Sequence, residues 1–422
     1  MSSVDSPPGA GKTRLVEGVV ATAVQRLGLS VAVATPRAEQ SFDVLRRLSA
    51  NFDPMQIEVL QSNRRFLPSD LRADPQVAAP VSSPGDLLGG RGVVVGAASK
   101  FVASVPRFRY PQFQLLVCDE AYQLPAKDID PLVTIAEQVL LVGDPGQLPP
   151  LVKADPARFE AARYRVHRPA PEELLRRYPG IPREQLPATF CFPQATVDLV
   201  QPSFYPHLPF GSGVPDEERR FHLRAAGIGT PIDRALDLLA EGASVVGILA
   251  PEKPVGQGGV DDEIAAIMAR MCRRALDRGP EWEGEGRLGP ADIGCADAHV
   301  ASGAAVRRHL LADGIREELV VETPEIWQGL QRPLMVVKHT LSGLLRVDPF
   351  SLQPGRTCVM LSRHQVGCVI VGRDGVGEAL DRYQHDSGAR ASAAEDATWS
   401  GWRARATLWE QLERSGRLIR IA

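Results

Sequence analysis

A short segment near the start of the chain constrains the fold more than any other feature. Ser6–Thr13 reads SPPGAGKT and comes directly before a helical run, Arg14–Leu27. The general phosphate-binding loop is G-x-x-x-x-G-K-S/T, and here Ser6 replaces the first glycine. Glycines let backbone N–H groups curl around a phosphate at the amino terminus of a helix. The segment therefore predicts a strand–loop–helix unit that binds a nucleotide.

Some residues of this loop are expected to bind phosphate and one to bind a metal ion. Lys12 is expected to reach the β- and γ-phosphates, and Thr13 to offer its hydroxyl to Mg²⁺. Contacts with the nucleotide are expected from the stretch Pro8, Gly9, Ala10, Gly11, Lys12, Thr13 and Arg14. Because the loop begins almost at Met1, the strand before it can be only a few residues long. We expect that the chain is truncated or its start misassigned.

Two acids follow a later apolar run, as metal-assisted phosphoryl transfer requires. Leu115–Gln123 reads LLVCDEAYQ. Asp119 is suited to the shell of Mg²⁺, and Glu120 is suited to orient or deprotonate the attacking water. The next apolar run ends in Gly143–Pro150, which reads GDPGQLPP. Gln147 of this segment is expected to hydrogen-bond the γ-phosphate and to sense its loss.

Apolar runs separated by helical segments predict doubly wound α/β architecture. The expected strands of the first half are Leu29–Thr35, Gly92–Gly96, Gln114–Cys118 and Val139–Gly143. Those of the second half are Ser244–Ala250, Ile293–Ala296, Leu319–Glu322, Pro333–His339, Thr357–Leu361 and Gly367–Gly372. The segment Gly279–Gly289 is expected to be a surface loop. We predict a nucleotide-binding domain over 1–185, a second domain over 186–377 and a helical tail over 378–422.

Composition sets limits on location and partners. The net charge of −3 argues against a protein that coats duplex DNA by bulk electrostatics. No run of about 18 apolar residues is present, so no membrane span is expected. Six widely spaced cysteines lack the pairs of a zinc site, which favours a reducing cytoplasm. In the tail, Trp399, Trp402, Ala406, Trp409 and Leu412 share one helical stripe, which either covers a hydrophobic patch or binds a protein partner.

The phosphate loop, DEAYQ and GDPGQLPP together resemble the superfamily-one helicases, in particular the 5′→3′ branch that includes the nonsense-mediated-decay helicase. The resemblance extends over nearly the whole chain. It implies two RecA-like domains with parallel sheets, ATP and Mg²⁺ as ligands, and single-stranded DNA or RNA as partner. The glutamine segment that reads adenine in helicases normally precedes the loop and is absent from this sequence.

Further motifs carry the resemblance beyond the nucleotide site. Ala34–Leu48 resembles motif Ia, which implies backbone contacts from Thr35 and Pro36. Gly96–Phe101 resembles the next strand-end contact and implies that Ser99 and Lys100 bind phosphate. Val320–Gln331 resembles motif V; it implies nucleic-acid contacts at Thr323, Trp327 and Gln328, and a nucleotide contact at Gly329. Gly355–Gly372 resembles motif VI, in which Arg363 would be the arginine finger on the γ-phosphate.

The sequence departs from the family mostly in its second half. Aligning Phe204-Tyr205 with the downstream Phe-Tyr of the family places Cys191 where an arginine for the γ-phosphate is expected. Motif V reads Gln328-Gly329-Leu330-Gln331, so the acid of the family is lost, and Ser302 stands at a position where the family usually has glutamine. Cys191 is alternatively a small apolar residue packed under the following helix. In that case another basic residue, such as one of the pair Arg176–Arg177, would complete the site.

Three functions fit these motifs. The first is an ATP-hydrolysing helicase or single-strand translocase, with ATP at the interface of the two RecA-like domains. The second is a helicase-derived module that binds nucleic acid or a protein partner when ATP is bound but turns over slowly. The third is an ATPase subunit of a larger nuclease or defence assembly.

Overall fold

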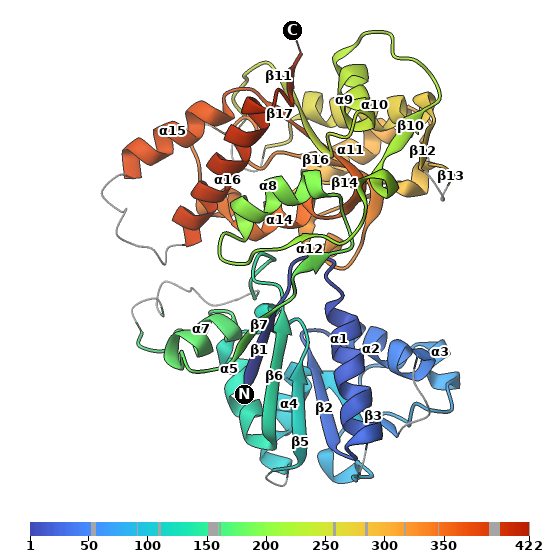
Figure 1. The fold of residues 1–422 in the computed structure, drawn as a ribbon, viewed down its shortest axis with the longest axis vertical. Helices are drawn as coiled ribbons and strands as arrows, with labels where there is room; N and C mark the ends of the chain where they lie inside the picture. Colours follow the sequence, from blue (N-terminus) through green and yellow to red (C-terminus); the bar gives the residue numbers. More distant parts are fainter. Residues whose placement is uncertain are drawn as a thin grey trace. The chain divides into compact units, whose positions relative to one another are not determined.

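The chain forms two compact α/β units (Figure 1). The computed structural model describes residues 1–51, 56–90, 92–108, 111–150, 159, 162–255, 259–282, 286–315, 318–344, 346–387 and 397–421. The first unit comprises Met1–Pro145 and Pro149–Leu186, and the second comprises Gly146–Leu148 and Pro187–Ala422. The helical tail is thus grouped with the second unit. The domain limits expected from the sequence stay a prediction.

The first unit is built on a parallel sheet of seven strands in the order β3-β4-β2-β5-β6-β1-β7. Its strands are β1 (Ser2–Asp5), β2 (Ser30–Thr35), β3 (Ile57–Leu60), β4 (Gly92–Ala97), β5 (Phe113–Cys118), β6 (Ala136–Gly143) and β7 (Arg183–Gln185). The strands β2, β4, β5 and β6 confirm the four expected apolar runs. They form because valine-rich segments are stable in a sheet that is buried on both faces.

Helices cover both faces of this sheet. They are α1 (Lys12–Ala21), α2 (Ala38–Asn51), α3 (Ser69–Ala73), α4 (Ala98–Ser104), α5 (Ala126–Leu132) and α7 (Ala170–Arg177). Val16 of α1 and Leu45 of α2 pack in the core on one face. Phe101 of α4 and Ile129 of α5 pack in the core on the other. The helices therefore leave the carboxyl ends of the strands for the loops that carry the polar motifs.

The second unit has a parallel sheet of six strands in the order β15-β14-β16-β17-β11-β18. These strands are β11 (Val245–Ala250), β14 (Ile293–Ala296), β15 (Val320–Glu322), β16 (Arg332–Lys338), β17 (His364–Arg373) and β18 (Leu418–Arg420). Two small sheets accompany it, one of β8 (Ala188–Thr189) and β9 (Gly211–Ser212), the other of β10 (Phe221–Leu223), β12 (Pro280–Trp282) and β13 (Gly286–Arg287). Two parallel sheets flanked by helices confirm the prediction of tandem RecA-like α/β domains.

The helices of the second unit lie on both sides of its large sheet (Figure 1). They are α8 (Gln194–Phe204), α9 (Pro231–Ala240), α10 (Asp262–Arg278), α11 (Val300–Ala312), α12 (Pro324–Trp327), α13 (Pro349–Leu352), α14 (Pro354–Leu361), α15 (Val376–Ser387) and α16 (Ala397–Arg414). The hydrophobic core on one side includes residues of α9, α10 and α11. The core on the other side includes residues of α8, α14 and α16.

Two expected elements are corrected by the structure. The run Thr357–Leu361, expected as a strand, belongs to the helix α14. Pro354 fits the first turn of that helix, and a short, wholly buried apolar run has no periodicity that separates strand from helix. The segment Gly279–Gly289, expected as a loop, contains the strands β12 and β13; its residues 283–285 lie outside the described part of the chain.

The tryptophan stripe of the tail packs inside the second unit. Trp402, Trp409 and Leu412 are buried, and the indole N–H of Trp402 donates to the carbonyl of Leu380 at 2.8 Å. Arg405, also buried, donates to the carbonyls of Leu352 and Gln353. The stripe therefore covers a hydrophobic patch, and these buried side chains are not available to a protein partner.

Candidate nucleotide site and strand cleft

The phosphate-loop residues lie between β1 and α1, as the motif predicts. Gly9 and Gly11 have φ angles of 71° and 82°, a backbone conformation that only glycine adopts without strain. The strand β1 is short but pairs with both β6 and β7. The backbone N–H of Ser6 continues this pairing by donating to the carbonyl of Gly143 at 3.0 Å. The loop is therefore held at the carboxyl edge of the sheet, where parallel α/β sheets bind ligands.

The acid pair lies opposite the loop lysine. Only β6 separates β1 from β5 in the sheet, so the end of β5 faces the phosphate loop. The Nζ atom of Lys12 lies 3.3 Å from Oε1 of Glu120. Burial alone would lower the pKa of Lys12, but the carboxylates of Glu120, Asp144 and Asp119 raise it above its ordinary value. The lysine is therefore held charged in a buried position.

The negative charge of Asp119 is only partly balanced by nearby positive charge. Burial, and next the nearby Glu120 carboxylate, raise the pKa of Asp119 well above its usual range. One of its oxygens accepts the backbone N–H of Glu120 at 2.9 Å. A divalent cation would relieve this crowding of negative charge, and carboxylate and hydroxyl oxygens, as on Asp119 and Thr13, are the kind of donor that Mg²⁺ prefers. The residues present fit a magnesium ion, whose remaining ligands would be phosphate and water.

Glu120 has a strained backbone. Its φ angle is 52°, and it is the one residue other than glycine with positive φ among the described residues. Such a conformation costs on the order of 1–3 kcal/mol and persists where surrounding contacts impose it. The contacts here are the Lys12 pair and a hydrogen bond of 3.2 Å from the Gln123 amide to Glu120 Oε2. Strain at this position aims the carboxylate back toward the phosphate loop.

A buried network beneath the loop was not predicted from the sequence. Asp5, the last residue of β1, is wholly buried and accepts a hydrogen bond of 2.9 Å from the Tyr122 hydroxyl. Arg183 of β7 donates to the other oxygen of Asp5. Burial and the Asp5 carboxylate raise the pKa of Tyr122. The network ties the loop strand to the turn that carries Glu120, and its only sequence signal is a tyrosine within LLVCDEAYQ.

Gln147 and the basic pair Arg176–Arg177 were also predicted to act at the γ-phosphate, and the structure gives each of them other contacts. Gln147 belongs to the segment Gly146–Leu148, which is grouped with the second unit, where Leu148 joins the hydrophobic core. Arg176 pairs with Glu173, and the Arg177 guanidinium lies 4.3 Å from the ring centroid of Tyr164. A role for these three residues at a γ-phosphate stays a prediction.

A polar cleft of about 290 Å³ lies at the carboxyl ends of β2, β3 and β4 in the first unit. Three residues predicted to contact nucleic acid line it together, namely Pro36, Ser99 and Lys100. Arg37 adds positive charge, Arg65 pairs with Glu39 of the same lining at 2.7 Å, and the Lys100 ammonium donates to the carbonyl of Ser82 at 2.7 Å. The cleft therefore gathers segments that are far apart in the sequence into one polar surface with a net positive charge.

Gln61 also lines this cleft, and no sequence motif includes it. Its side chain is 6% exposed, and its Nε2 atom has no hydrogen-bond partner among the described residues. A buried amide without a partner costs about 1–3 kcal/mol. Gln61 therefore adds to the lining of the cleft a hydrogen-bond donor that no described residue uses.

Thr35 and Trp327, both predicted to contact nucleic acid, are buried side chains. Thr35 is wholly buried, and its hydroxyl bonds Arg37 O and Ser41 Oγ, which shapes the start of α2. Trp327 is wholly buried too, and its indole N–H donates to the carbonyl of Cys295 at 2.9 Å. Contacts of these two residues with nucleic acid stay predictions.

The other motif V residues lie on the surface of the second unit or close to it. Thr323 precedes α12, and Gly329 is exposed with a φ angle of 87°. Gln328 is half-buried, and its Nε2 has no hydrogen-bond partner among the described residues. Ser302 is buried and accepts the Lys338 ammonium at 2.9 Å. Contacts of Thr323, Gln328 and Gly329 with ligands stay predictions.

Two of the positions that depart from the family pattern, Cys191 and Gln331, contact each other. The Gln331 amide donates to the sulfur of Cys191, so both departures lie side by side without charge. Arg363 is 4% exposed, and its Nε has no hydrogen-bond partner among the described residues. Its carbonyl accepts the backbone N–H of Arg332 at 2.9 Å, which links it to the strand that follows Gln331. Cys191 and Arg363 thus belong to neighbouring loops of the second unit.

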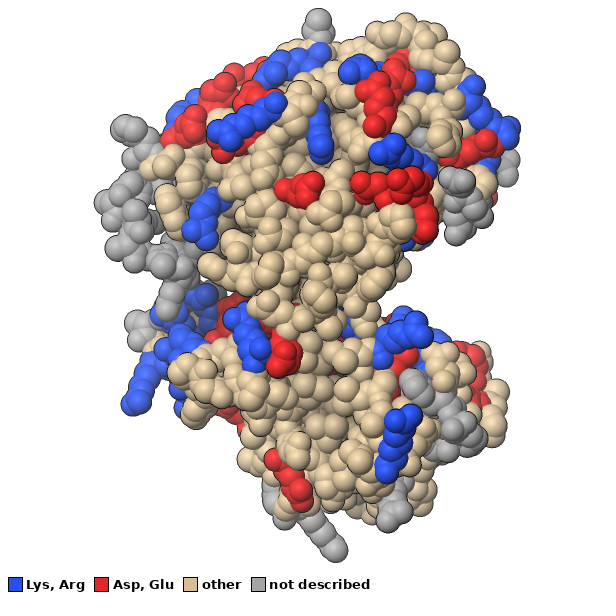
Figure 2. All heavy atoms as spheres, in the orientation of Figure 1, with Lys and Arg blue, Asp and Glu red and all other residues tan. Residues whose placement is uncertain are grey.

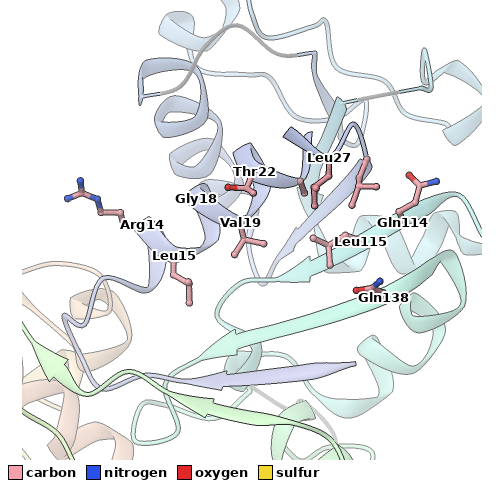
Figure 3. A pocket seen from close by; sticks show the side chains of 11 residues that line it. Arg14, Leu15, Gly18, Val19, Thr22, Leu27, Gln114, Leu115 and Gln138 are labelled. Carbon is pink, nitrogen blue, oxygen red and sulfur yellow. The ribbon is translucent and has the colours of Figure 1, made fainter. Parts of the chain in front are cut away.

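A hollow of about 560 Å³ lies beside α1 in the first unit (Figure 3). Its lining is mostly apolar and includes Leu15, Val19 and Leu115. It lies toward the amino-terminal ends of β2, β5 and β6, so it is not the nucleotide site. Arg14, predicted to contact the nucleotide, is exposed at its edge.

The surface charges agree with the low net charge. Figure 2 shows basic and acidic side chains interspersed on the viewed face of each unit, with no single basic surface. None of the described helices is long and apolar enough to cross a membrane. All six cysteines are free thiols, and the sulfurs of Cys272 and Cys295 lie 3.5 Å apart in the hydrophobic core of the second unit.

The comparisons with known proteins place the first unit in a broad class. Residues 1–168 match a family model described as an AAA domain, so this part of the chain is similar to such domains. No curated protein matches the chain. A PRRSV helicase structure is similar at 17% identity and a TM-score of 0.43, over 89% of this chain and 52% of that one. Arterivirus nonstructural protein 10 (helicase) has 15% identity and a TM-score of 0.47, over 90% and 61%. The chain thus spans less than two thirds of these structures.

Proposed function

We propose that the protein hydrolyses ATP with Mg²⁺ and couples this reaction to a single strand of nucleic acid, as a helicase or translocase of superfamily one. The observation that carries the proposal is the convergence of Lys12, Asp119 and Glu120. These residues come from distant segments, and the Lys12 ammonium lies 3.3 Å from the Glu120 carboxylate. The assignment to the 5′→3′ branch rests on the sequence motifs.

The chemistry follows from these side chains. Lys12 and the loop N–H groups would bind the β- and γ-phosphates, and Thr13 and Asp119 would hold Mg²⁺, which neutralises phosphate charge. Glu120 would orient and deprotonate the attacking water. Arg363 would supply positive charge to the transition state, a role that rests on its motif. Gln147 would sense the γ-phosphate.

The basic cleft supports the nucleic-acid part of the proposal. Single strands are bound by grooves that track the phosphate backbone with a few basic and polar groups. The cleft offers Arg37, Arg65, Lys100 and Ser99 for this purpose. Backbone contacts carry little base information, so either DNA or RNA fits. Cytoplasmic location stays a prediction.

One observation favours a second function, a nucleotide-gated binding module that turns over slowly. The Cys191–Gln331 contact puts two uncharged side chains where the family pattern has charged ones. A site that lacks one cation stabilises the transition state less. The role of an ATPase subunit in a larger assembly has no comparable support, because the tryptophan stripe is buried.

The deciding experiment measures ATP turnover of the full chain with no nucleic acid, with single-stranded DNA, with single-stranded RNA and with duplex. We expect turnover that rises severalfold with one kind of single strand and less with duplex. Slow turnover with tight, ATP-dependent strand binding would favour the gated module. The absence of both turnover and ATP-dependent strand binding would overturn both functions.

A further inference from the structure

A continuous row of hydrogen bonds runs from the rim of the basic cleft to Glu120. The backbone N–H of Arg37 donates to Oε1 of Gln40 at 3.0 Å. The Gln40 amide nitrogen donates to Oε1 of Gln123 at 3.5 Å. The Gln123 amide nitrogen in turn donates to Oε2 of Glu120 at 3.2 Å, and the other Glu120 oxygen meets Lys12. All these residues belong to the first unit.

In each glutamine of this row, the amide oxygen accepts one hydrogen bond and the amide nitrogen donates another. Reversing the Gln123 amide would turn its oxygen toward the Glu120 carboxylate, where two acceptors repel. Reversing the Gln40 amide would likewise turn its nitrogen toward the N–H of Arg37. The orientation of both amides is thus set from the two ends of the row, so a change at one end is felt at the other.

One end of this row lies at the cleft, where a single strand would bind, and the other lies at the nucleotide site. At the cleft, Arg37 is exposed and lines the basic surface next to Pro36 and Glu39. At the nucleotide site, Glu120 is strained, and among the described residues its carboxylate contacts the Gln123 amide and the Lys12 ammonium. A small shift of the Gln123 amide would therefore change where the Glu120 carboxylate points.

We propose that Gln40 and Gln123 are positioning residues that transmit strand binding in the cleft to the catalytic Glu120. This inference rests on the proposed function and adds the means by which the strand raises turnover. A phosphate bound at Arg37 shifts the turn that begins α2, the Gln40 amide follows, and Gln123 then adjusts the Glu120 carboxylate. Gln40 is outside the lining of the cleft, so its proposed role is to position Gln123 and not to bind the strand.

The test compares ATP turnover of the wild type, Gln40→Ala and Gln40→Glu, each without strand and with a saturating single strand. Gln40→Ala removes the link and should leave strand-free turnover and the KM for ATP close to the wild-type values. Stimulation by the strand should fall by about 2- to 30-fold, the range found for residues that couple two sites. Strand affinity should stay within about twofold, because the cleft is intact.

Gln40→Glu separates hydrogen-bond polarity from packing. The glutamate has nearly the same shape and still accepts the Arg37 N–H, but it presents an oxygen to Oε1 of Gln123. Stimulation at saturating strand should therefore fall in Gln40→Glu as it does in Gln40→Ala. The matched control is Gln138→Ala, an exposed glutamine of the same unit, which should be stimulated like the wild type.

The outcomes distinguish the relay from the proposed function. A stimulated wild type with equally stimulated Gln40→Ala and Gln40→Glu variants would overturn the relay alone. Equal proportional losses of strand-free and stimulated turnover in both variants would also overturn it, because that result indicates a merely structural role. A wild type that hydrolyses ATP but responds to no strand would overturn the nucleic-acid part of the proposed function, and the relay with it.

Discussion

The two units of this protein are built on the same kind of parallel sheet, but the loops of each sheet carry different side chains. In the first unit, charged groups converge and find partners: Lys12 meets Glu120, and Asp5 meets Tyr122 and Arg183. In the second unit, the corresponding loops bring an uncharged pair together, Cys191 and Gln331, and leave Arg363 buried. On the proposed function, the first unit would bind the nucleotide, and the charge that the second unit supplies would set the rate of hydrolysis.

The largest expected effect is on the first unit. Lys12→Ala should lower ATP turnover by about 10³-fold or more, because it removes the cation that stabilises charge on the transferred phosphate. The variant should still fold, because Lys12 is not part of the hydrophobic core, but its melting temperature should fall, because the carboxylates of Glu120 and Asp119 lose a positive partner. Turnover and thermal unfolding of the same preparation check the two parts. Undiminished turnover would refute the assignment of the phosphate loop.

The second effect concerns the charge that the second unit supplies. Arg363→Ala should lower kcat by about 10³-fold if the arginine acts on the transition state. Cys191→Arg should raise kcat with little change in ATP affinity, because the new charge acts as the phosphoryl group departs. Steady-state kinetics of both variants give kcat and KM separately.

The matched control for that pair is Cys191→Ala, which removes the sulfur without adding charge. We expect it to keep the wild-type kcat. A Cys191→Arg variant with a lower melting temperature and no gain in kcat would show that Cys191 is a packing residue beneath α8.

These predictions differ in how directly the sequence supported them. The phosphate loop and the acid pair could be predicted because each is a contiguous segment tied to one strand end, so strand order alone brings Lys12 and Glu120 together. Gln61 and Arg183 could not, because single polar residues within a short strand or just after one carry no pattern. The contact of Cys191 with Gln331 joins segments about 140 positions apart, and only the packed fold shows it. The helix Pro354–Leu361 was missed because a buried apolar run is ambiguous in period.

A smaller effect is expected at the basic cleft. Gln61→Leu should weaken single-strand binding severalfold, since the amide can no longer donate to the strand. It should also raise the free energy of unfolding by up to about 1–3 kcal/mol, because an unpartnered buried N–H is removed. Fluorescence anisotropy with a labelled strand and denaturant unfolding measure the two quantities. Gln138→Leu is the control, and weaker binding together with lower stability would indicate a packing role for Gln61.

The smallest effect is a pH dependence of the second unit. Burial, aided by the Arg363 charge, lowers the pKa of His364 to about 3, and burial together with the Arg405 charge lowers the pKa of His339 to about 3. Below pH 6.5 both histidines become protonated in the unfolded chain, whereas in the folded unit they stay neutral down to about pH 3. Stability is therefore fully present above pH 6.5 and falls by about 1.4 kcal/mol per pH unit for each histidine as the pH drops.

Tryptophan fluorescence reports this unfolding selectively, because all five tryptophans of the chain lie after residue 186. The free energy of unfolding should be lower at pH 5.5 than at pH 7, and His364→Gln should reduce the difference. His207→Gln, at an exposed position, should not. An unchanged pH dependence in His364→Gln would show that other groups cause it.

The central claim, that the first unit holds a hydrolytic nucleotide site built on Glu120, is tested most directly by Glu120→Gln. Binding of Mg²⁺·ATP is measured by equilibrium titration and hydrolysis by single-turnover kinetics, on the same protein. Lys12, Thr13 and Asp119 remain in this variant, so we predict ATP affinity within about tenfold of the wild type. We predict that hydrolysis falls by about 10²-fold or more, because the group that activates water is lost. Hydrolysis at the wild-type rate, or loss of ATP binding in a folded variant, would contradict the account.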